Sequence, residues 1–289
     1  MSLSSPNSIK NFMARPLTSS LGAEIEGVDL ATELSDVIFN KIYEALLRYQ
    51  VLVFRDHDFP PERQLEFGQR FGEVQVHVLN QFHDHQYPEL YILTNLDKEG
   101  KPDGKHPDPG SLYWHTDGSW TQRRTLATML YSLEAPLQGG ETQLADMYGA
   151  YEALTDEMKM CIGSLRAIHH LNFHKKRRDP VPLTAEQVRK TPPVEHDIVR
   201  IHSETGRPTV YLGDMAESIV GIEYDQSRLW IEELNELITR PEFIYTHKWR
   251  SRELVIWDNR CTLHRSMPYN TSAERRVMRR LTVLDREPE

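Results

Sequence analysis

The chain has 289 residues, and its hydrophobic content of 39% is enough to bury a substantial core within one domain. Its formal net charge of −9 argues against nucleic acid as the main partner, because phosphate binding needs a surplus of Lys and Arg on one face. The only cysteines are Cys161 and Cys261, so neither a disulfide framework nor a thiolate metal cluster is expected.

Residues 1–13 contain Ser, Asn and Pro without a continuous apolar run. They lack the core of a secretory signal and are expected to form a flexible tail. No stretch of the sequence approaches the ~18 apolar residues that a membrane span requires. Together with the low cysteine content, these features predict a single cytoplasmic domain over residues 14–289 that does not bind a membrane.

Helix and strand patterns alternate in the first third of the chain. Residues 34–49 have apolar side chains at helical spacing and lead into the apolar run 51–54, which predicts a helix followed by a strand. Pro60-Pro61-Glu62 predicts the start of a second helix, which continues through Phe71 and ends at Gly72.

Strands predominate in the rest of the chain. The turn sequence Glu204-Thr205-Gly206-Arg207 separates two apolar segments and predicts a β-hairpin. Helices are expected at residues 146–165 and 225–240. Numerous short strands with helices outside predict a mixed α and β fold with a jelly-roll core and flanking helices, rather than a parallel α/β sheet. The expected strands cover residues 90–93, 126–133, 198–202, 209–212, 243–249, 254–257 and 280–284.

A His-x-Asp pattern, which could supply two metal ligands, occurs twice among the 13 histidines, so the pattern alone is weak evidence. His106-Pro107-Asp108 lies in a Pro- and Gly-rich loop that is too irregular to aim two side chains. His115 and Asp117 follow Leu112-Tyr113-Trp114 at an expected strand end, where residues i and i+2 project to the same face. The second pair is therefore the better candidate, and its alternative is a hydrogen-bonded structural pair.

A third ligand would have to come from a strand that is distant in sequence. His264, which follows Trp257-Asp258-Asn259-Arg260, is one candidate, and His202 and His247 compete with it. Two imidazoles and one carboxylate form the ligand set that holds Fe(II) on one face and leaves the opposite positions open for a cosubstrate and oxygen. The sequence therefore predicts an oxygenase.

Several motifs occur in a fixed order along the chain. They are Trp114-His115-Thr116-Asp117, Gly139-Gly140-Glu141-Thr142, Trp257-Asp258-Asn259-Arg260, His264, and Arg275-Arg276-Val277-Met278-Arg279-Arg280. From about Pro16 to the C-terminus, the sequence resembles the Fe(II)/2-oxoglutarate-dependent dioxygenases of the taurine dioxygenase and 2,4-dichlorophenoxyacetate dioxygenase family. The resemblance implies a double-stranded β-helix, in agreement with the jelly roll predicted from the strand pattern.

The resemblance also implies roles for eight residues. The iron ligands would be His115, Asp117 and His264, the distal carboxylate of 2-oxoglutarate would pair with Arg276 assisted by Thr142, and the acidic group of the prime substrate would contact His77, Arg280 and the backbone of Gly118. A planar guanidinium suits the 2-oxoglutarate carboxylate because it donates two parallel hydrogen bonds.

The segment before the double arginine departs from the family pattern. It is one residue longer, around Ala273-Glu274, so Arg276 is preferred over Arg275 by alignment to the residues that follow, and Arg275 stays an alternative. Without the family context, Gly139-Gly140 reads as an ordinary turn, and the arginines from 275 to 280 read as a solvated strand edge.

The activity implied by the resemblance is hydroxylation of a small organic carboxylate or sulfonate, coupled to conversion of 2-oxoglutarate and O2 into succinate and CO2. Hydroxylation beside a heteroatom can go on to cleave a C–O, C–S or C–N bond. The alternatives are an iron-dependent oxidase that converts an N-carboxymethyl amino acid to an isonitrile, a non-oxidative metal hydrolase, and a binding protein on the same fold. A homodimer or homotetramer is expected, as in many soluble enzymes.

Two further sets of residues are expected to have no part in the chemistry. The basic run Lys175-Lys176-Arg177-Arg178 is expected to be a solvated loop. A structural or solvent-facing role is expected for His83, His85, His169 and His170.

Overall fold

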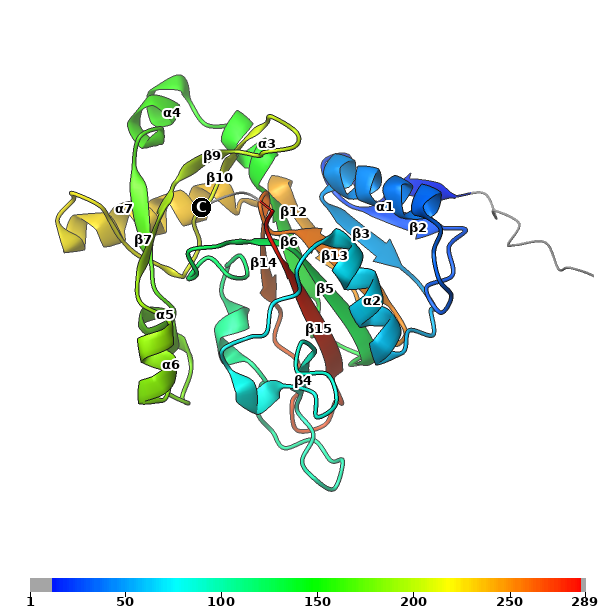
Figure 1. Cartoon of the computed structure of the whole chain (residues 1–289). Helices are drawn as coiled ribbons and strands as arrows, with labels where there is room; N and C mark the ends of the chain where they lie inside the picture. Colours follow the sequence, from blue (N-terminus) through cyan, green and yellow to red (C-terminus); the bar gives the residue numbers. More distant parts are fainter. Residues whose placement is uncertain (1–11, 287–289) are drawn as a thin grey trace, which may run out of the picture.

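The largest sheet of the computed structural model, which describes residues 12–286, has seven strands in the order β1-β2-β3-β13-β5-β15-β4 (Figure 1). Neighbouring strands are antiparallel except for the β2–β3 pair. Most of the tail expected at residues 1–13 lies outside the described residues, but Met13 already pairs with Glu26. The strand bounds are β1 Met13–Pro16, β2 Ala23–Glu26, β3 Val51–Phe54, β4 Tyr91–Thr94, β5 Thr125–Glu134, β13 Leu254–Asp258 and β15 Val277–Leu284.

A smaller sheet has the order β12-β6-β14, with β12 at Ile244–His247, β6 at Thr142–Asp146 and β14 at Thr262–Ser266. An isolated antiparallel bridge joins His264 of β14 to His115. Each of these two residues donates its backbone N–H to the carbonyl of the other, at 3.0 and 2.8 Å. This bridge brings together two histidines that are far apart in the sequence.

Two helices, α1 (Asp36–Tyr49) and α2 (Pro61–Phe71), pack against the large sheet around β3, β5 and β13 (Figure 1). Ser35 caps α1 by accepting a hydrogen bond from the backbone of Ile38, and Pro61 occupies the first turn of α2, where a missing N–H has no cost. Phe39, Phe67 and Phe71 meet edge to face beneath the helices. Helix α1 and β3 were predicted from their apolar patterns and α2 from its proline start, and all three are confirmed.

Most of the remaining elements, including α3, α4, α7, β7, β9 and β10, gather on the other side of the molecule (Figure 1). They include a three-stranded sheet in the order β11-β7-β8 and the predicted hairpin, β9 with β10. No helix formed by residues 12–286 combines the length and apolar character needed to cross a bilayer. The bounds are β7 Arg166–His169, β8 Val194–Asp197, β9 Val199–Ile201, β10 Pro208–Val210, β11 Ala216–Ile219, α3 Met147–Glu152, α4 Asp156–Ile162, α5 Leu171–Arg178, α6 Ala185–Lys190, α7 Tyr224–Ile238, and the 3-10 helices η1 Asn80–Phe82, η2 Pro109–Leu112 and η3 Pro241–Phe243.

The mixed α and β character is confirmed, but the local predictions for residues 146–165 and for the segment before His115 were wrong. The single helix expected at residues 146–165 is two helices, because Thr155 leaves the helical conformation and caps α4 by accepting from Met158. The strand expected before His115 is absent: Leu112 ends the 3-10 helix η2, and His115 makes only the isolated bridge to His264.

Candidate metal centre

His115, Asp117 and His264 lie together in the interior, with 5%, 8% and 7% of their surfaces exposed. One nitrogen or oxygen atom from each lies within 4.8 Å of the others. The Nε2 atoms of His115 and His264 are 4.0 and 3.6 Å from oxygens of Asp117. The structure therefore brings together the three residues that the sequence singled out as iron ligands.

The backbone turn after Asp117 is fixed by close packing. Gly118 has a φ of +68°, a conformation that residues with a Cβ rarely adopt, and an added Cβ would lie 2.4 Å from Cγ2 of Thr125. The Thr125 hydroxyl donates to the Asp117 carbonyl at 2.5 Å. The bridge to β14 fixes His115, and this turn fixes Asp117, so the pair is positioned without the strand that was predicted.

The protonation states of the three side chains suit a divalent metal ion. The Nδ1 atom of His115 lies 2.8 Å from the Tyr113 carbonyl, to which it donates, and this leaves the Nε2 lone pair for a metal. Burial lowers the pKa of His115 and lowers that of His264 to about 3, so both rings are neutral. Burial alone would raise the pKa of Asp117, but the Arg280 guanidinium holds it well below its usual range. Two neutral imidazoles and one carboxylate fit Fe(II).

A chain of hydrogen bonds runs from β13 to Asp117. The Trp257 indole donates to Oδ1 of Asn259 at 3.1 Å, and the Asn259 amide donates to the Thr128 hydroxyl at 2.9 Å. Thr128 then donates to Oδ2 of Asp117 at 2.6 Å. Sequence reasoning missed Thr128, although a threonine within the apolar run of β5 was the available signal.

Replacing Thr128 with valine is expected to weaken Fe(II) binding by about ten- to a hundredfold, because partners that orient metal ligands have effects of this size. Valine keeps the shape of threonine but cannot donate to Asp117. The matched control is Ser132→Ala on the same strand, since the buried Ser132 hydroxyl has no hydrogen-bond partner among the described residues. Competition with a chelator measures both affinities, and equal affinities in the two variants would contradict the role of Thr128.

The two competing histidines are held by other carboxylates. His202 lies 3.1 Å from Asp258, and His247 lies 3.1 Å from Glu253. His202, Asp258 and Cys261 form a second buried group of metal-binding residue types. The Arg260 guanidinium already contacts both Asp258 oxygens, at 2.9 and 2.7 Å, and supplies the positive charge there. This second group is therefore better explained as a structural ion pair.

The two candidate arginines for 2-oxoglutarate differ in their surroundings. Arg275 is exposed and binds both carboxylate oxygens of Glu134, at 2.5 and 2.9 Å. Arg276 is 2% exposed, and its Nε has no partner among the described residues. Burial lowers the pKa of Arg276 to about 10, so it is still charged at neutral pH. A buried cation with an open donor is suited to bind an anionic ligand.

Further polar groups contribute to this region. Thr142 of β6 is 3% exposed, and its hydroxyl accepts a hydrogen bond from the Trp249 indole at 2.9 Å, which leaves its own proton to donate. His106 and Tyr269 have ring centroids 5.7 Å apart, and each has a buried polar atom without a partner among the described residues. Sequence reasoning missed Tyr269 and set His106 aside because its loop is irregular.

A small cavity of about 30 Å³ lies against His115 and Asp117 of the cluster. Arg280 lines it, 3.3 Å from Asp117 and with its guanidinium over the Tyr91 ring. His77 lines it too: burial, followed by the charge of Arg280, lowers the pKa of this ring to about 3. Because Nδ1 of His77 accepts from the Leu79 backbone at 3.1 Å, Nε2 carries the proton and can donate. Gly118 is not among the residues that line this cavity.

Helix α5 forms another wall of the same cavity. The solvated loop expected at residues 175–178 is wrong in that these residues belong to α5 and Lys175 is buried, whereas Lys176 and Arg177 are exposed as expected. Lys175 is 6% exposed and lies 2.6 Å from Asp179 and 3.4 Å from Asp108. Arg178 pairs with Asp214 at 2.7 Å. Asp108 and Asp214 are far from the basic run in sequence, so its composition alone gave no sign that Lys175 is buried.

The four histidines for which a structural or solvent-facing role was expected lie outside the metal cluster. His85 is exposed, whereas the ring of His83 bonds the His77 carbonyl. His169 is fully buried in β7, and His170 lies 2.7 Å from Glu217.

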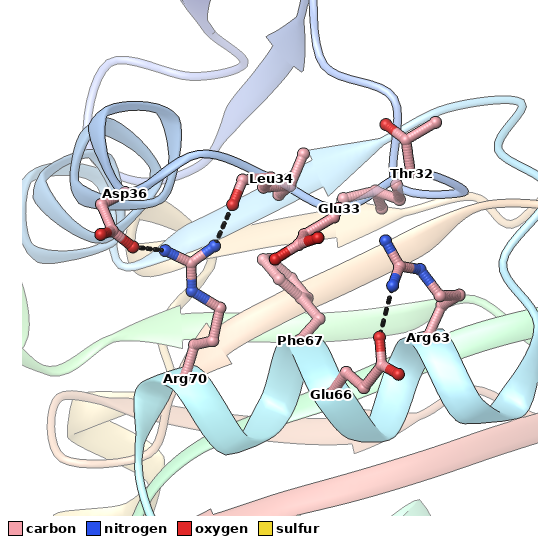
Figure 2. A pocket seen from close by; sticks show the side chains of 9 residues that line it. Thr32, Glu33, Leu34, Asp36, Arg63, Glu66, Phe67 and Arg70 are labelled. Carbon is pink, nitrogen blue, oxygen red and sulfur yellow. Dashed lines mark hydrogen bonds and ion pairs between the residues drawn. The ribbon is translucent and has the colours of Figure 1, made fainter. Parts of the chain in front are cut away.

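A surface hollow of about 420 Å³ lies between α2 and residues 30–36 (Figure 2). Arg63 pairs with Glu66 there, and Arg70 pairs with Asp36 and the Leu34 carbonyl, as Figure 2 shows. These arginines already have partners, so their charges do not favour an anionic ligand.

Residues 14–282 match the family model described as "Taurine catabolism dioxygenase TauD, TfdA family". The chain is 31% identical to an alpha-ketoglutarate-dependent 2,4-dichlorophenoxyacetate dioxygenase from Cupriavidus pinatubonensis, over 94% of this chain and 98% of the relative. It is 29% identical to an alkylsulfatase from Acinetobacter baylyi, over 96% of this chain and 86% of the relative. The crystal structure of AAD-2 in complex with Mn(II) and N-oxalylglycine has a TM-score of 0.86 and 33% identity, and covers 96% of this chain and 98% of that one.

Proposed function

The chain belongs to the TauD/TfdA dioxygenase family, and on this premise we propose which substrate it takes and which residues carry the reaction. It is an Fe(II)- and 2-oxoglutarate-dependent dioxygenase that oxidises a small organic anion and forms succinate and CO2. The observation that supports the site assignment most strongly is the buried convergence of His115, Asp117 and His264. Relatives named for phenoxy acids and sulfate esters support the anionic substrate class.

In this proposal, Fe(II) is held by Nε2 of His115, the Asp117 carboxylate and Nε2 of His264. Bound iron supplies the activation of O2 and the site for the keto-acid end of 2-oxoglutarate. Asp117 is kept ionised by Arg280 and is oriented by Thr128, so the ligand set needs no proton transfer before the metal binds.

Arg276 and Thr142 bind the distal carboxylate of 2-oxoglutarate. The buried guanidinium supplies charge and a fork of donors, and the threonine hydroxyl adds a further donor. Arg275 already engages Glu134 at the surface, which supports Arg276 as the member of the pair that binds the cosubstrate.

Arg280 and His77 bind the acidic group of the prime substrate. Nε2 of His77 donates a hydrogen bond, while Arg280 contributes positive charge from a position beside Asp117. The anion is thereby held next to the metal ligands, where its C–H bonds are close to the oxidant. The backbone of Gly118 remains a further candidate contact.

We also propose that the two sheets containing β5 and β6 form the double-stranded β-helix of the family. Their antiparallel strands, with helices packed outside, support this description. A single domain over residues 14–289, a cytoplasmic location, and a homodimer or homotetramer also belong to the proposal. Light scattering of the purified protein measures the oligomeric state directly.

The alternative functions are less well supported. An isonitrile-forming oxidase of N-carboxymethyl amino acids and a noncatalytic binding protein are not favoured by the dioxygenases to which the chain is similar. A non-oxidative hydrolase is not favoured by the family match, and it would leave the buried Arg276 with its open donor without a role.

The substrate class is tested by measuring succinate release in the presence of phenoxyacetate, short alkyl sulfates and alkyl sulfonates. At least one of these anions is expected to raise succinate release well above the rate without it. His77→Leu is expected to raise the KM for that anion by about tenfold or more, since a hydrogen bond to a charged group is worth ~1.5–3 kcal/mol. Its KM for 2-oxoglutarate should not change. If every anion failed to stimulate an enzyme that binds iron and 2-oxoglutarate, the substrate class would be wrong.

A further inference from the structure

The cavity beside the metal cluster is too small to hold a whole organic acid. Its volume of about 30 Å³ is roughly that of one water molecule, whereas sites for organic ligands measure ~300–1,000 Å³. A second cavity of about 520 Å³ lies next to it. We call the first the inner cavity and the second the outer cavity.

The two cavities share a wall. Leu79 and Lys175 line both, and Asp108 of the inner cavity lies between Pro107 and Pro109 of the outer one. Apolar packing also crosses this wall, because Leu183 of the outer cavity packs against a buried cluster of three residues that line the inner cavity. Those residues are Trp120, Leu171 and Met215.

The polar part of the wall is the ion pair between Lys175 and Asp108, which can separate without leaving the buried Lys175 ammonium group unpaired. Lys175 lies 3.4 Å from Asp108 but only 2.6 Å from Asp179, its neighbour one turn further along the chain. If Asp108 moves away, Lys175 keeps Asp179 as its counter-ion, so the buried ammonium group stays paired and only the Asp108 carboxylate loses its contact. The weaker contact is the one that connects α5 to the loop before η2.

The lining of the outer cavity presents more apolar than polar surface, although it includes two acidic and two basic side chains. The apolar residues include Leu79, Phe82, Pro107, Val181 and Leu183, and the charged ones are Asp103, Lys105, Lys175 and Asp179. Such a lining favours a hydrocarbon or an aromatic ring over a second charged group. The inner cavity, by contrast, presents Arg280 and His77. The two cavities together therefore match one molecule with an acidic end and an apolar end.

We propose that the outer cavity binds the apolar part of the enzyme's own prime substrate, an elongated amphipathic anion whose acidic group lies in the inner cavity. The substrate passes between Asp108 and Lys175, which separate to admit it. This inference rests on the proposed function, because that function places the acidic group at His77 and Arg280.

The test uses the protein loaded with Mn(II) and N-oxalylglycine, so that no turnover takes place. Calorimetric titration with n-alkyl sulfates of two, four, six and eight carbons measures binding alone. We expect affinity to rise by about fourfold for each methylene that enters the outer cavity. Phenoxyacetate serves as an aromatic probe in the same assay.

A substitution at the edge of the outer cavity shows where the apolar part of the substrate binds. Val181 is 63% exposed and lines the outer cavity, so Val181→Trp can fill it with little effect on the core. This variant is expected to weaken binding of the eight-carbon sulfate by about tenfold or more and to leave the two-carbon sulfate nearly unchanged. The matched control is Val37→Trp, at a 57% exposed position on α1, which should behave like the wild type.

The outcomes separate this inference from the function on which it rests. Equal affinity for all chain lengths, or an eight-carbon affinity that Val181→Trp leaves unchanged, would overturn the outer-cavity inference while the dioxygenase assignment stood. If neither the alkyl sulfates nor phenoxyacetate bound to the protein loaded with Mn(II) and N-oxalylglycine, the proposed substrate class would be wrong as well.

Discussion

Replacing His264 with alanine is expected to abolish 2-oxoglutarate turnover and to weaken Fe(II) binding by more than about a hundredfold. Loss of a group that only orients a metal ligand already costs about ten- to a hundredfold in affinity, so loss of the ligand itself should cost more. The remaining pair, His115 and Asp117, would hold the ion with two side chains instead of three. Metal titration followed by succinate measurement checks both parts of the prediction.

The apoprotein of this variant should remain folded, because the substitution removes a buried ring without breaking the backbone bridge between residues 115 and 264. Thermal unfolding with and without Fe(II) separates metal binding from folding, since a ligand that binds only the native state raises its stability. His85→Ala is the matched control, because His85 is exposed and lies outside the cluster. Wild-type metal affinity in His264→Ala would remove His264 from the ligand set.

Replacing Arg276 with alanine is expected to raise the KM for 2-oxoglutarate by at least roughly thirtyfold. Removal of one partner from a buried, hydrogen-bonded charge pair costs ~2–5 kcal/mol, and Arg276 is buried with an open donor. Arg276→Lys should recover only part of the affinity, because an ammonium group has the charge but not the planar fork. Steady-state kinetics at saturating iron measure both effects.

Arg275→Ala is the matched control for this prediction. Its ion pair with Glu134 is exposed, and pairs of that kind contribute ~0–1 kcal/mol. The KM for 2-oxoglutarate should therefore change little. A large effect at Arg275 with a small one at Arg276 would show that the extra residue near Ala273 shifts the binding role to Arg275.

The elements with a local physical cause were predictable from the sequence. Helix α1 has helical apolar spacing and a serine cap, and α2 has a proline in its first turn. Strand β14 was missed because its short run contains His264 and Arg265, so it has no apolar alternation. Its place beside β6 depends on pairing with a segment more than a hundred residues away.

The residues of the candidate site were predictable in part, as the helices and strands were. The order of motifs singled out the residues that the structure brings together, although the strand expected at His115 does not form. Thr128 and the α5 wall were missed because folding, and not the local sequence pattern, places their partners. Thr128 meets Asn259 of β13, and Lys175 meets Asp108 in addition to the nearby Asp179. Lys175 reads as a solvated charge until Asp108 is placed beside it.

The account is tested most directly by an anaerobic visible absorption titration of the wild-type protein with Fe(II) and 2-oxoglutarate. We expect a charge-transfer band that requires both additions, because in the proposed function the cosubstrate binds to iron held by His115, Asp117 and His264. A folded protein with demonstrated iron occupancy that gave no band on addition of 2-oxoglutarate would contradict the central claim.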